Sequence, residues 1–250
     1  MTRPHLRICH LYPDMMNIYG DRGNVIALER RCRWRGMEVE IAGLGPGERL
    51  DPHRFDLYFM GGGQDREQEL VCRDLQEVKG EPLREAHAAG ACFLTICGGY
   101  QLFGRFFRTW KGEELPGIGI FDAWTVGGEK RFIGNVVAEW EGAPGGPRTL
   151  VGFENHSGRT MLGPGSEPLA RVKVGYGNNG EDGWEGCRSG NAFGTYLHGS
   201  LLPKNPWLAD ELIRLALRRR HGDIELQPLD DSLEERAHAA AVERARRSRG

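Results

Sequence analysis

The sequence predicts an α/β protein with a mainly parallel β-sheet and helices on both of its faces. Through the first hundred residues, short apolar segments alternate with amphipathic segments of helical period. Two of the apolar segments run directly into glycine clusters, at 61–63 and 98–99. Because the carboxyl ends of parallel strands meet at one edge of a sheet, where ligands bind, we expect a functional site there.

The elements of this first half follow from hydrophobic periodicity. Strands are predicted at 6–12, 37–44, 55–60 and 91–96, and helices at 25–35, 67–79 and 82–89. In the first of these helices Val25, Ile26, Leu28 and Cys32 are expected on one side, and Gly36 supplies the C-cap. A further helical pattern covers 101–107, directly after the second glycine cluster.

The second half changes character. Short strand candidates stand at 116–126, 132–140, 150–155, 171–176 and 191–197, divided by Gly, Pro and Asn turns. This pattern predicts a small antiparallel sheet beside the parallel one. Amphipathic helices follow at 206–219 and 231–247.

Composition excludes several classes of function. The chain has 250 residues, with 33 Lys and Arg against 35 Asp and Glu, so charge gives no reason to expect nucleic-acid binding. No apolar run reaches the length of a transmembrane span, and the polar N-terminus is no signal-peptide core. The six cysteines form no CxxC pair, which argues against a zinc site or a disulfide framework and favours a cytoplasmic location.

The strongest chemical signal is a cysteine at a strand-to-helix corner. Cys97 ends the apolar run 91–96 and precedes Gly98 and Gly99. A side chain at such a corner points over the sheet edge, and the following helix directs its N-terminal amides toward it, which favours the thiolate. The same residues also fit a buried structural cysteine before an ordinary glycine turn, and the local pattern leaves both interpretations open.

A nucleophilic cysteine needs a base, and two of the eight histidines are candidates. His156 lies in Gly152-Phe153-Glu154-Asn155-His156-Ser157-Gly158, and His198 follows the strand candidate 191–197. The position after a strand slightly favours His198, because it places the ring at a sheet edge. For either residue, the alternative is a hydrogen-bonded loop histidine.

The segment Ile96-Cys97-Gly98-Gly99-Tyr100-Gln101 resembles the nucleophile elbow of class I, triad-type glutamine amidotransferases. Four further segments agree in order and spacing with the CobQ-like branch, which contains the cobyric acid synthases and the GatD proteins: 11–24, 60–65, 152–160 and 196–199. The segment 11–24 resembles GatD alone. The chain also lacks a GxxxxGK[ST] loop, whereas cobyric acid synthases carry an ATP-binding domain.

The resemblance implies a fold and a domain plan. It implies a flavodoxin-like, class I amidotransferase three-layer sandwich with a small antiparallel sheet. One glutamine amidotransferase domain would span 1–250, with a catalytic core at 6–225 and a C-terminal amphipathic helix within 226–250.

The resemblance also implies catalytic roles. Cys97 would attack the glutamine carboxamide, and His198 would take the thiol proton and protonate the leaving ammonia. The backbone N–H groups of Gly98 and Gly62 would bind the oxyanion.

Two further residues match substrate-binding positions of the family. Gln101 matches a position that contacts glutamine. Arg131 matches an arginine that holds substrate in GatD proteins, and a guanidinium suits the α-carboxylate of glutamine. The alternative for Arg131 is a surface arginine in a basic pair.

Two residues depart from the family pattern. Thr95 replaces the first glycine of the elbow, and Ser200 stands where most members have the glutamate that orients the catalytic histidine. Four acids of this chain are possible replacements for that glutamate: Asp14, Asp21, Asp65 and Glu154. The sequence-based hypothesis is that the acid comes from a partner subunit instead.

A glutaminase implies a synthetase that uses its ammonia. In GatD proteins this partner is a MurT-like, Mur-ligase-type subunit that amidates D-glutamate in the lipid II stem peptide to D-isoglutamine, with ATP and metal on the partner and no cofactor in the glutaminase chain. Two alternatives are the amidotransferase component of a cobyrinate-type cofactor-amidating enzyme and a non-catalytic scaffold.

Overall fold

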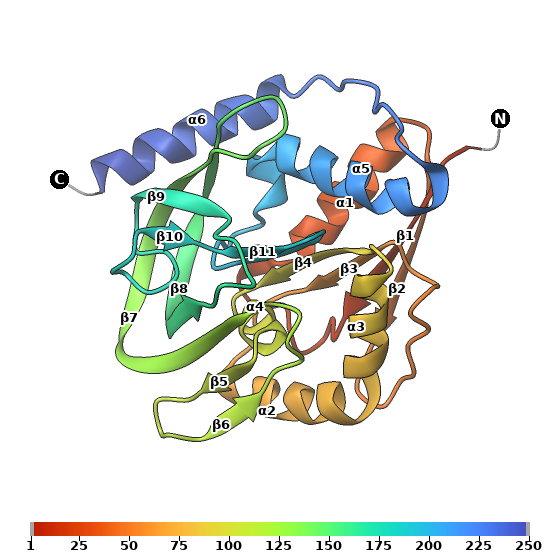
Figure 1. Ribbon diagram of the computed structural model, residues 1–250. Helices are drawn as coiled ribbons and strands as arrows, with labels where there is room; N and C mark the ends of the chain where they lie inside the picture. The colour runs from red at the N-terminus through yellow and green to blue at the C-terminus, as the bar shows by residue number, and fades with distance from the viewer. Residues whose placement is uncertain (1–2, 249–250) are drawn as a thin grey trace.

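The computed structural model describes residues 3–248, apart from the side chain of Asp65, and contains two β-sheets (Figure 1). The first sheet has the strand order β11-β12-β4-β3-β1-β2. Its strands are β1 (His5–Leu11), β2 (Glu38–Leu44), β3 (Leu57–Met60), β4 (Cys92–Ile96), β11 (Cys187–Ser189) and β12 (Ala192–Thr195). All neighbours pair in parallel except β11 and β12, which confirms the predicted α/β class with a mainly parallel sheet.

Helices cover both faces of this sheet. The structure contains α1 (Arg22–Trp34), α2 (Asp65–Asp74), α3 (Gly80–Ala88), α4 (Gly98–Phe103), α5 (Pro206–His221) and α6 (Ser232–Arg247), with short 3-10 helices η1 (Ile18–Gly20) and η3 (Leu202–Lys204) and a π-helical segment η2 (Leu75–Lys79). In Figure 1, α1 and α5 lie on one face, and α3 and α4 lie on the other. Strands β3 and β4 are therefore buried on both faces, which explains their uninterrupted apolar sequences.

The second sheet stands beside the first and is mainly antiparallel. Its order is β10-β9-β7-β5-β6, and β8 pairs with β7. Its strands are β5 (Phe106–Arg108), β6 (Glu114–Pro116), β7 (Ala123–Trp140), β8 (Arg148–Leu162), β9 (Ala170–Val174) and β10 (Trp184–Glu185). The long β7–β8 hairpin forms one side of the molecule in Figure 1.

Three predictions about local structure were wrong. The strands predicted separately at 116–126 and 132–140 are replaced by one strand, β7, which runs from Ala123 to Trp140. Strand β8 pairs with β7 on both sides of a register shift between Gly127 and Phe132. The helix predicted at 101–107 ends at Phe103, and β5 begins at Phe106. The strand predicted at 191–197 for the antiparallel sheet belongs to the first sheet, where β12 pairs in parallel with β4.

The C-terminal helix packs on its own chain. In α6, Ala245 is buried against Val137 of β7 and Val151 of β8. The segment that leads into α6 is also fixed, since the Arg31 guanidinium binds Asp210 of α5 at 2.7 Å and Asp231 at 2.6 Å.

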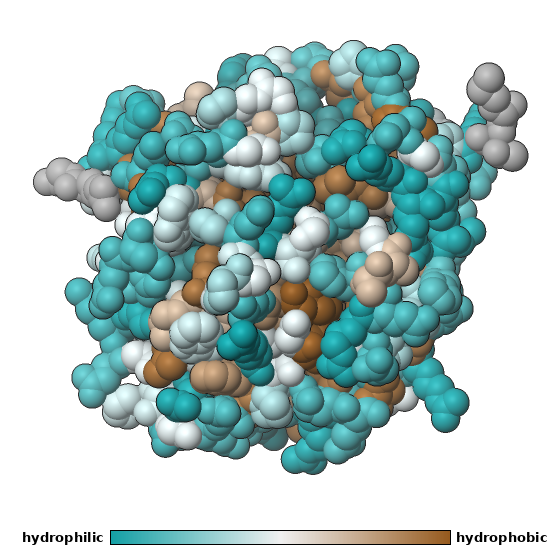
Figure 2. Space-filling view, viewed as in Figure 1, coloured by the Kyte–Doolittle hydropathy of each residue, from teal (hydrophilic) through white to brown (hydrophobic). Residues whose placement is uncertain are grey.

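The surface is predominantly polar on the face seen in Figure 2, and hydrophobic residues show mainly in the hollows between hydrophilic ones. Within residues 3–248, no helix has the length and apolar character that crossing a membrane requires.

Candidate active site

Cys97 occupies a strained corner between β4 and α4. Its backbone has φ +49° and ψ −105°, a left-handed conformation that non-glycine residues rarely adopt. Such a conformation costs about 1–3 kcal/mol and persists only where neighbours enforce it. Here the Cys97 N–H donates to Thr195 O at 2.8 Å, and Cys97 O accepts from Gln101 N–H at 2.9 Å. The side chain is 7% exposed.

His198 reaches the same edge because β12 lies beside β4. Thr195 pairs with Ile96, so the residues that follow both strands leave the sheet side by side. The His198 backbone then pairs with Phe153 of β8, donating to Phe153 O at 2.8 Å and accepting from Phe153 N at 3.2 Å. The His198 side chain is fully buried, and its Nε2 has no hydrogen-bond partner within the described part of the chain.

A carboxylate of this chain holds the other ring nitrogen. His198 Nδ1 lies 3.1 Å from Oδ1 and 3.2 Å from Oδ2 of Asp21, which is completely buried. Asp21 stands after η1 in the loop that follows β1, and β1 neighbours β3 in the sheet. The hypothesis that a partner must supply this acid is therefore corrected, since Asp21 already stands at the ring.

The other three acids have different positions. Asp14 is exposed. Glu154 accepts hydrogen bonds from the backbone N–H groups of Tyr176 and Gly177 at 2.8 and 3.0 Å. The side chain of Asp65 lies outside the described residues. Ser200, in place of the usual glutamate, donates to Gly20 O at 2.7 Å and so ties the η1 loop to the segment of His198.

The electrostatics of the site favour a charged imidazole. Burial acts to lower the pKa of His198, but the Cys97 thiol and the Asp21 carboxylate outweigh it and raise the pKa to about 10. Asp21 occupies Nδ1, so Nε2 is the ring atom available to Cys97. The arrangement therefore favours a protonated His198 ring at neutral pH.

The glycine loop after β3 contributes differently from the prediction. The Gly62 N–H already donates to Asp21 Oδ2 at 2.8 Å, so this donor is not offered to an oxyanion. The next amide of the loop lies close to Gly98, the residue after the nucleophile, since a Cβ built on Gly98 would lie 3.1 Å from the Gly63 nitrogen. Gly62 instead gives room to the catalytic ring, because a Cβ there would lie 2.8 Å from His198 Cε1.

A pocket of about 650 Å³ opens above Cys97. It is lined from both sheets by Ile18, Tyr19, Gly63, Gln64, Arg66, Gln68, Cys97, Gln101, Phe107, Arg131, Asn155, His156, Ser157 and Gly158. The structure thus brings Cys97, Gln101 and Arg131, three of the residues singled out in the sequence, to one cavity.

Arg131 lies on the wall that the β7–β8 hairpin forms. Its Nε donates to Asn155 Oδ1 at 2.9 Å, and one terminal nitrogen donates to Asn155 O at 3.1 Å. Asn155 in turn donates to the Tyr19 hydroxyl at 2.7 Å. The Tyr19 ring meets His198 edge-on, with ring centroids 5.0 Å apart, so this chain of contacts spans the pocket mouth.

Gln101 is buried at the pocket wall with both ends of its carboxamide bound. Gln68 Nε2 donates to Gln101 Oε1 at 2.9 Å, and Gln101 Nε2 donates to the Tyr196 hydroxyl at 3.2 Å. The sequence analysis missed Gln68 and Tyr196. Gln68 does carry a signal, because it begins the inward-facing stripe of α2 that continues with Val71 and Cys72 at helical spacing.

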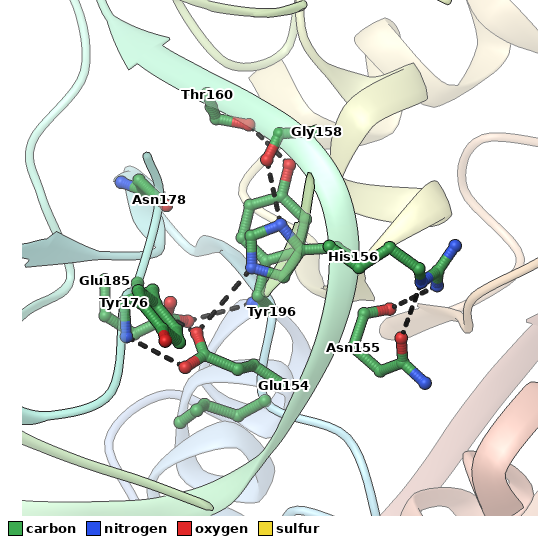
Figure 3. Close-up of polar contacts among 12 residues, drawn as sticks. Glu154, Asn155, His156, Gly158, Thr160, Tyr176, Asn178, Glu185 and Tyr196 are labelled. Carbon is green, nitrogen blue, oxygen red and sulfur yellow. Dashed lines mark hydrogen bonds and ion pairs between the residues drawn. The ribbon is translucent and has the colours of Figure 1, made fainter. Parts of the chain in front are cut away.

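His156, the second candidate base, has another environment. Its ring stacks on Tyr196, with centroids 3.6 Å apart and planes 10° apart (Figure 3). Nδ1 lies 2.9 Å from Gly158 O, and Nε2 lies 3.7 Å from the Glu154 carboxylate. Burial lowers its pKa, whereas that of His198 is raised. The structure therefore favours His198 as the base.

Comparison with known proteins agrees with this geometry. The model of the CobB/CobQ-like glutamine amidotransferase domain matches residues 7–206. The GatD subunit of the lipid II isoglutaminyl synthase (glutamine-hydrolyzing) of Staphylococcus aureus N315 is 41% identical over 98% of this chain and 98% of its own length. The chain belongs to the GatD-like, class I glutamine amidotransferases. The GatD subunit of Streptococcus pneumoniae R6 is 37% identical over 91% of this chain and 87% of its own length.

More distant members of the family match over a smaller part. A cobyric acid synthase of Pelotomaculum thermopropionicum is 38% identical, but over 56% of this chain and 28% of its own length.

Among solved structures, PurLQS of Thermotoga maritima has the same fold, with a TM-score of 0.61 at 17% identity over 85% of this chain and 98% of its own length. A glutamine amidotransferase of Thermotoga maritima has a TM-score of 0.55 at 17% identity, over 95% and 93%.

Proposed function

We propose that this GatD-like chain is the glutaminase subunit of a lipid II isoglutaminyl synthase. The observation that carries the proposal is the buried series Cys97–His198–Asp21, which ends at the floor of a pocket large enough for an amino acid. The similarity to two GatD subunits over nearly the whole chain supports the same assignment.

The geometry supports a thiolate mechanism. The Cys97 thiolate attacks the glutamine carboxamide carbon, and a C–S bond forms as the carbonyl oxygen becomes an oxyanion. His198, protonated and held by Asp21, gives its proton to the amide nitrogen, and the C–N bond breaks to release ammonia. Water then attacks the thioester while His198 takes one of its protons. The C–S bond breaks, glutamate leaves, and the remaining carboxyl proton passes to solvent.

Backbone amides are proposed to bind the oxyanion. Gly98 N–H follows the nucleophile and begins α4, where helix N–H groups have no partner within the helix. Gly63 N–H replaces Gly62 as the proposed second donor, because the Gly62 amide is bound to Asp21. Loss of one such donor costs about 3–4 kcal/mol of barrier in other hydrolases.

Substrate recognition is proposed to involve Arg131 of β7 on the opposite wall and Gln101 of α4 beside the nucleophile. Arg131 would pair with the α-carboxylate of glutamine, since its guanidinium lines the pocket and is held on Asn155. Gln101 would contact the substrate through the part of its carboxamide that its protein neighbours leave free.

The partner is proposed from the relatives' names and from the chemistry. The GatD relatives are subunits of a synthase, so a second subunit uses the ammonia. We propose a MurT-like, Mur-ligase-type synthetase that activates the D-glutamate α-carboxylate of the lipid II stem peptide with ATP and metal, in the cytoplasm. No cofactor is proposed for this chain. Among the described side chains, no group of three His, Cys, Asp or Glu has the placement to hold a metal ion.

The test is glutamine-dependent amidation of lipid II by this chain co-expressed with a MurT-like partner. The wild-type complex should amidate with glutamine or with ammonium. Cys97→Ala should lose the reaction with glutamine and keep the reaction with ammonium. Cys72→Ala is the control and should keep both reactions, because the Cys72 thiol lies outside the pocket and donates a hydrogen bond to Pro116 O.

Labelling with the glutamine analogue diazo-oxo-norleucine gives a second readout and should modify Cys97. Glutamine-dependent amidation that survives Cys97→Ala would contradict the proposed function. Amidation of a cobyrinate substrate in place of lipid II would favour the cofactor-amidating alternative, and absence of both labelling and glutaminase activity would favour the scaffold alternative.

A further inference from the structure

Gln101 belongs to a chain of hydrogen-bonded, uncharged side chains, and its other members have no role in the mechanism proposed above. Beyond Gln101, the Tyr196 hydroxyl lies 2.6 Å from Thr160 Oγ1, which lies 2.7 Å from Thr125 Oγ1. On the other side Gln68 donates to the Gln101 oxygen. All five side chains are at least nine-tenths buried, and they come from α2, α4, β7, β8 and the segment directly after β12.

The Tyr196 ring is fixed from two directions. One face stacks on His156, whose Nδ1 is bound to Gly158 O and whose Nε2 points to Glu154, as Figure 3 shows. The Tyr196 backbone N–H donates to Glu185 Oε1 at 2.9 Å. The hydroxyl therefore stands at one place, because neither the ring nor its backbone is free to move.

Gly158 makes the fit around the Gln101 carboxamide tight. A Cβ at this position would lie 2.5 Å from Gln101 Nε2 and 3.1 Å from the Tyr196 hydroxyl. The carboxamide is therefore surrounded by the β8 backbone, by Gln68 and by Tyr196. A carboxamide has two N–H donors and two acceptor positions on oxygen. With one N–H on Tyr196 and one acceptor position on Gln68, one donor and one acceptor position of this pocket-lining carboxamide have no hydrogen bond to the described side chains.

We propose that Tyr196 is a positioning residue that orients the Gln101 carboxamide for substrate, with His156 as the platform that holds the Tyr196 ring. This inference rests on the proposed glutaminase function. Without the hydroxyl, the Gln101 nitrogen loses its partner and the amide gains freedom to turn. The expected consequence is weaker binding of glutamine in the ground and transition states alike, because the side-chain hydrogen bond between His198 and Asp21 does not involve this chain of side chains.

The test is a double-mutant cycle with Tyr196→Phe and Gln101→Ala, assayed as glutaminase activity of the complex. Tyr196→Phe should raise KM for glutamine by about fivefold to tenfold, the effect of one neutral hydrogen bond, with kcat changed by less than about twofold. In the Gln101→Ala background the same change should have no further effect. Thr160→Val removes the partner of the Tyr196 hydroxyl and should raise KM in the same direction.

Tyr58→Phe is the matched control, since Tyr58 is a buried tyrosine of β3 whose hydroxyl binds Pro52 O away from the pocket. It should leave KM unchanged. The inference is overturned if Tyr196→Phe leaves KM unchanged, if its effect persists in Gln101→Ala, or if Tyr58→Phe raises KM equally. A wild-type complex without glutaminase activity would overturn the proposed function, and this inference with it.

Discussion

The two walls of the pocket come from two sheets and differ in burial. Cys97, His198 and Asp21 follow strands β4, β12 and β1 of the parallel sheet and are buried. The opposite wall comes from the β7–β8 hairpin, where Arg131 is exposed and Asn155 is held by it and by Tyr19. The reacting groups and Arg131, the proposed carboxylate-binding group, therefore lie on separate supports, whereas Gln101 of α4 lies on the same side of the pocket as Cys97.

This difference has a physical reason. Groups that exchange protons must keep one geometry and benefit from the low dielectric constant of a buried edge. In the parallel sheet, neighbouring strands end side by side, so strand order alone brings their following residues together. A wall that admits and releases substrate must stay open to solvent. The hairpin serves that purpose, because its pairing of Ile133 with Asn155 sets Arg131 beside Asn155 at the pocket mouth.

The strongest test of this division changes the buried edge. Asp21→Asn should lower kcat of the glutaminase reaction by about 10²- to 10⁴-fold, the range seen for orienting acids of other triads. Asparagine keeps an acceptor for Gly62 N–H, but it removes the negative charge that stabilises the His198 imidazolium. The measurement is steady-state glutaminase kinetics of the isolated chain and of the complex.

Asp14→Asn is the control, because Asp14 is an exposed acid of the same loop and should have no effect on kcat. If Asp21→Asn leaves kcat of the complex within about threefold of wild type, an acid from the partner orients His198 in place of Asp21. Equal wild-type rates with and without the partner would agree with an acid supplied by this chain.

The second test changes the open wall. Arg131→Ala should raise KM for glutamine by about tenfold to hundredfold, as expected for the loss of a charged pair with the α-carboxylate, while kcat changes much less. Lys130→Ala should leave both constants unchanged, since Lys130 is the exposed neighbour in the same basic pair. A fall in kcat with KM unchanged would place Arg131 among the reacting groups and break the division between the walls.

The third test concerns the seam between the sheets and has the smallest expected effect. Glu185 of β10 accepts hydrogen bonds from Thr195 and from Tyr196 N–H, next to β12. Burial raises its pKa to about 7 from 4.5. The folded protein therefore keeps a proton that the unfolded chain loses above about pH 4.5, so this residue makes stability fall as pH rises from 4.5 to 7.

Glu185→Gln should remove that contribution. The free energy of unfolding, measured with urea between pH 5 and 7.5, should fall less with pH in the variant than in the wild type. Glu181→Gln, which changes an exposed acid of the preceding turn, should follow the wild-type slope. Parallel slopes for Glu185→Gln and the wild type would show that Glu185 is ionised throughout this range.

Part of the site could be predicted from local sequence. Cys97 stands between an apolar strand and two glycines, and His198 follows a strand, so both could be placed at a sheet edge. The choice of Asp21 over Asp14 had no such signal, because the two acids share one loop and only the folded structure shows that Asp21 is buried and Asp14 exposed. Gly62 and Gly63 present the same difficulty, since adjacent amides of a glycine loop point in different directions.

The sequence by itself determined the buried parallel strands and the corner thiol, because uninterrupted apolar runs require cover on both faces and a glycine pair permits the sharp turn. Only the tertiary structure decided that β12 lies beside β4, that Asp21 holds His198, and that Tyr196 meets Gln101. These contacts join residues 95 to 177 positions apart, and their geometry depends on strand order and packing that no local pattern encodes.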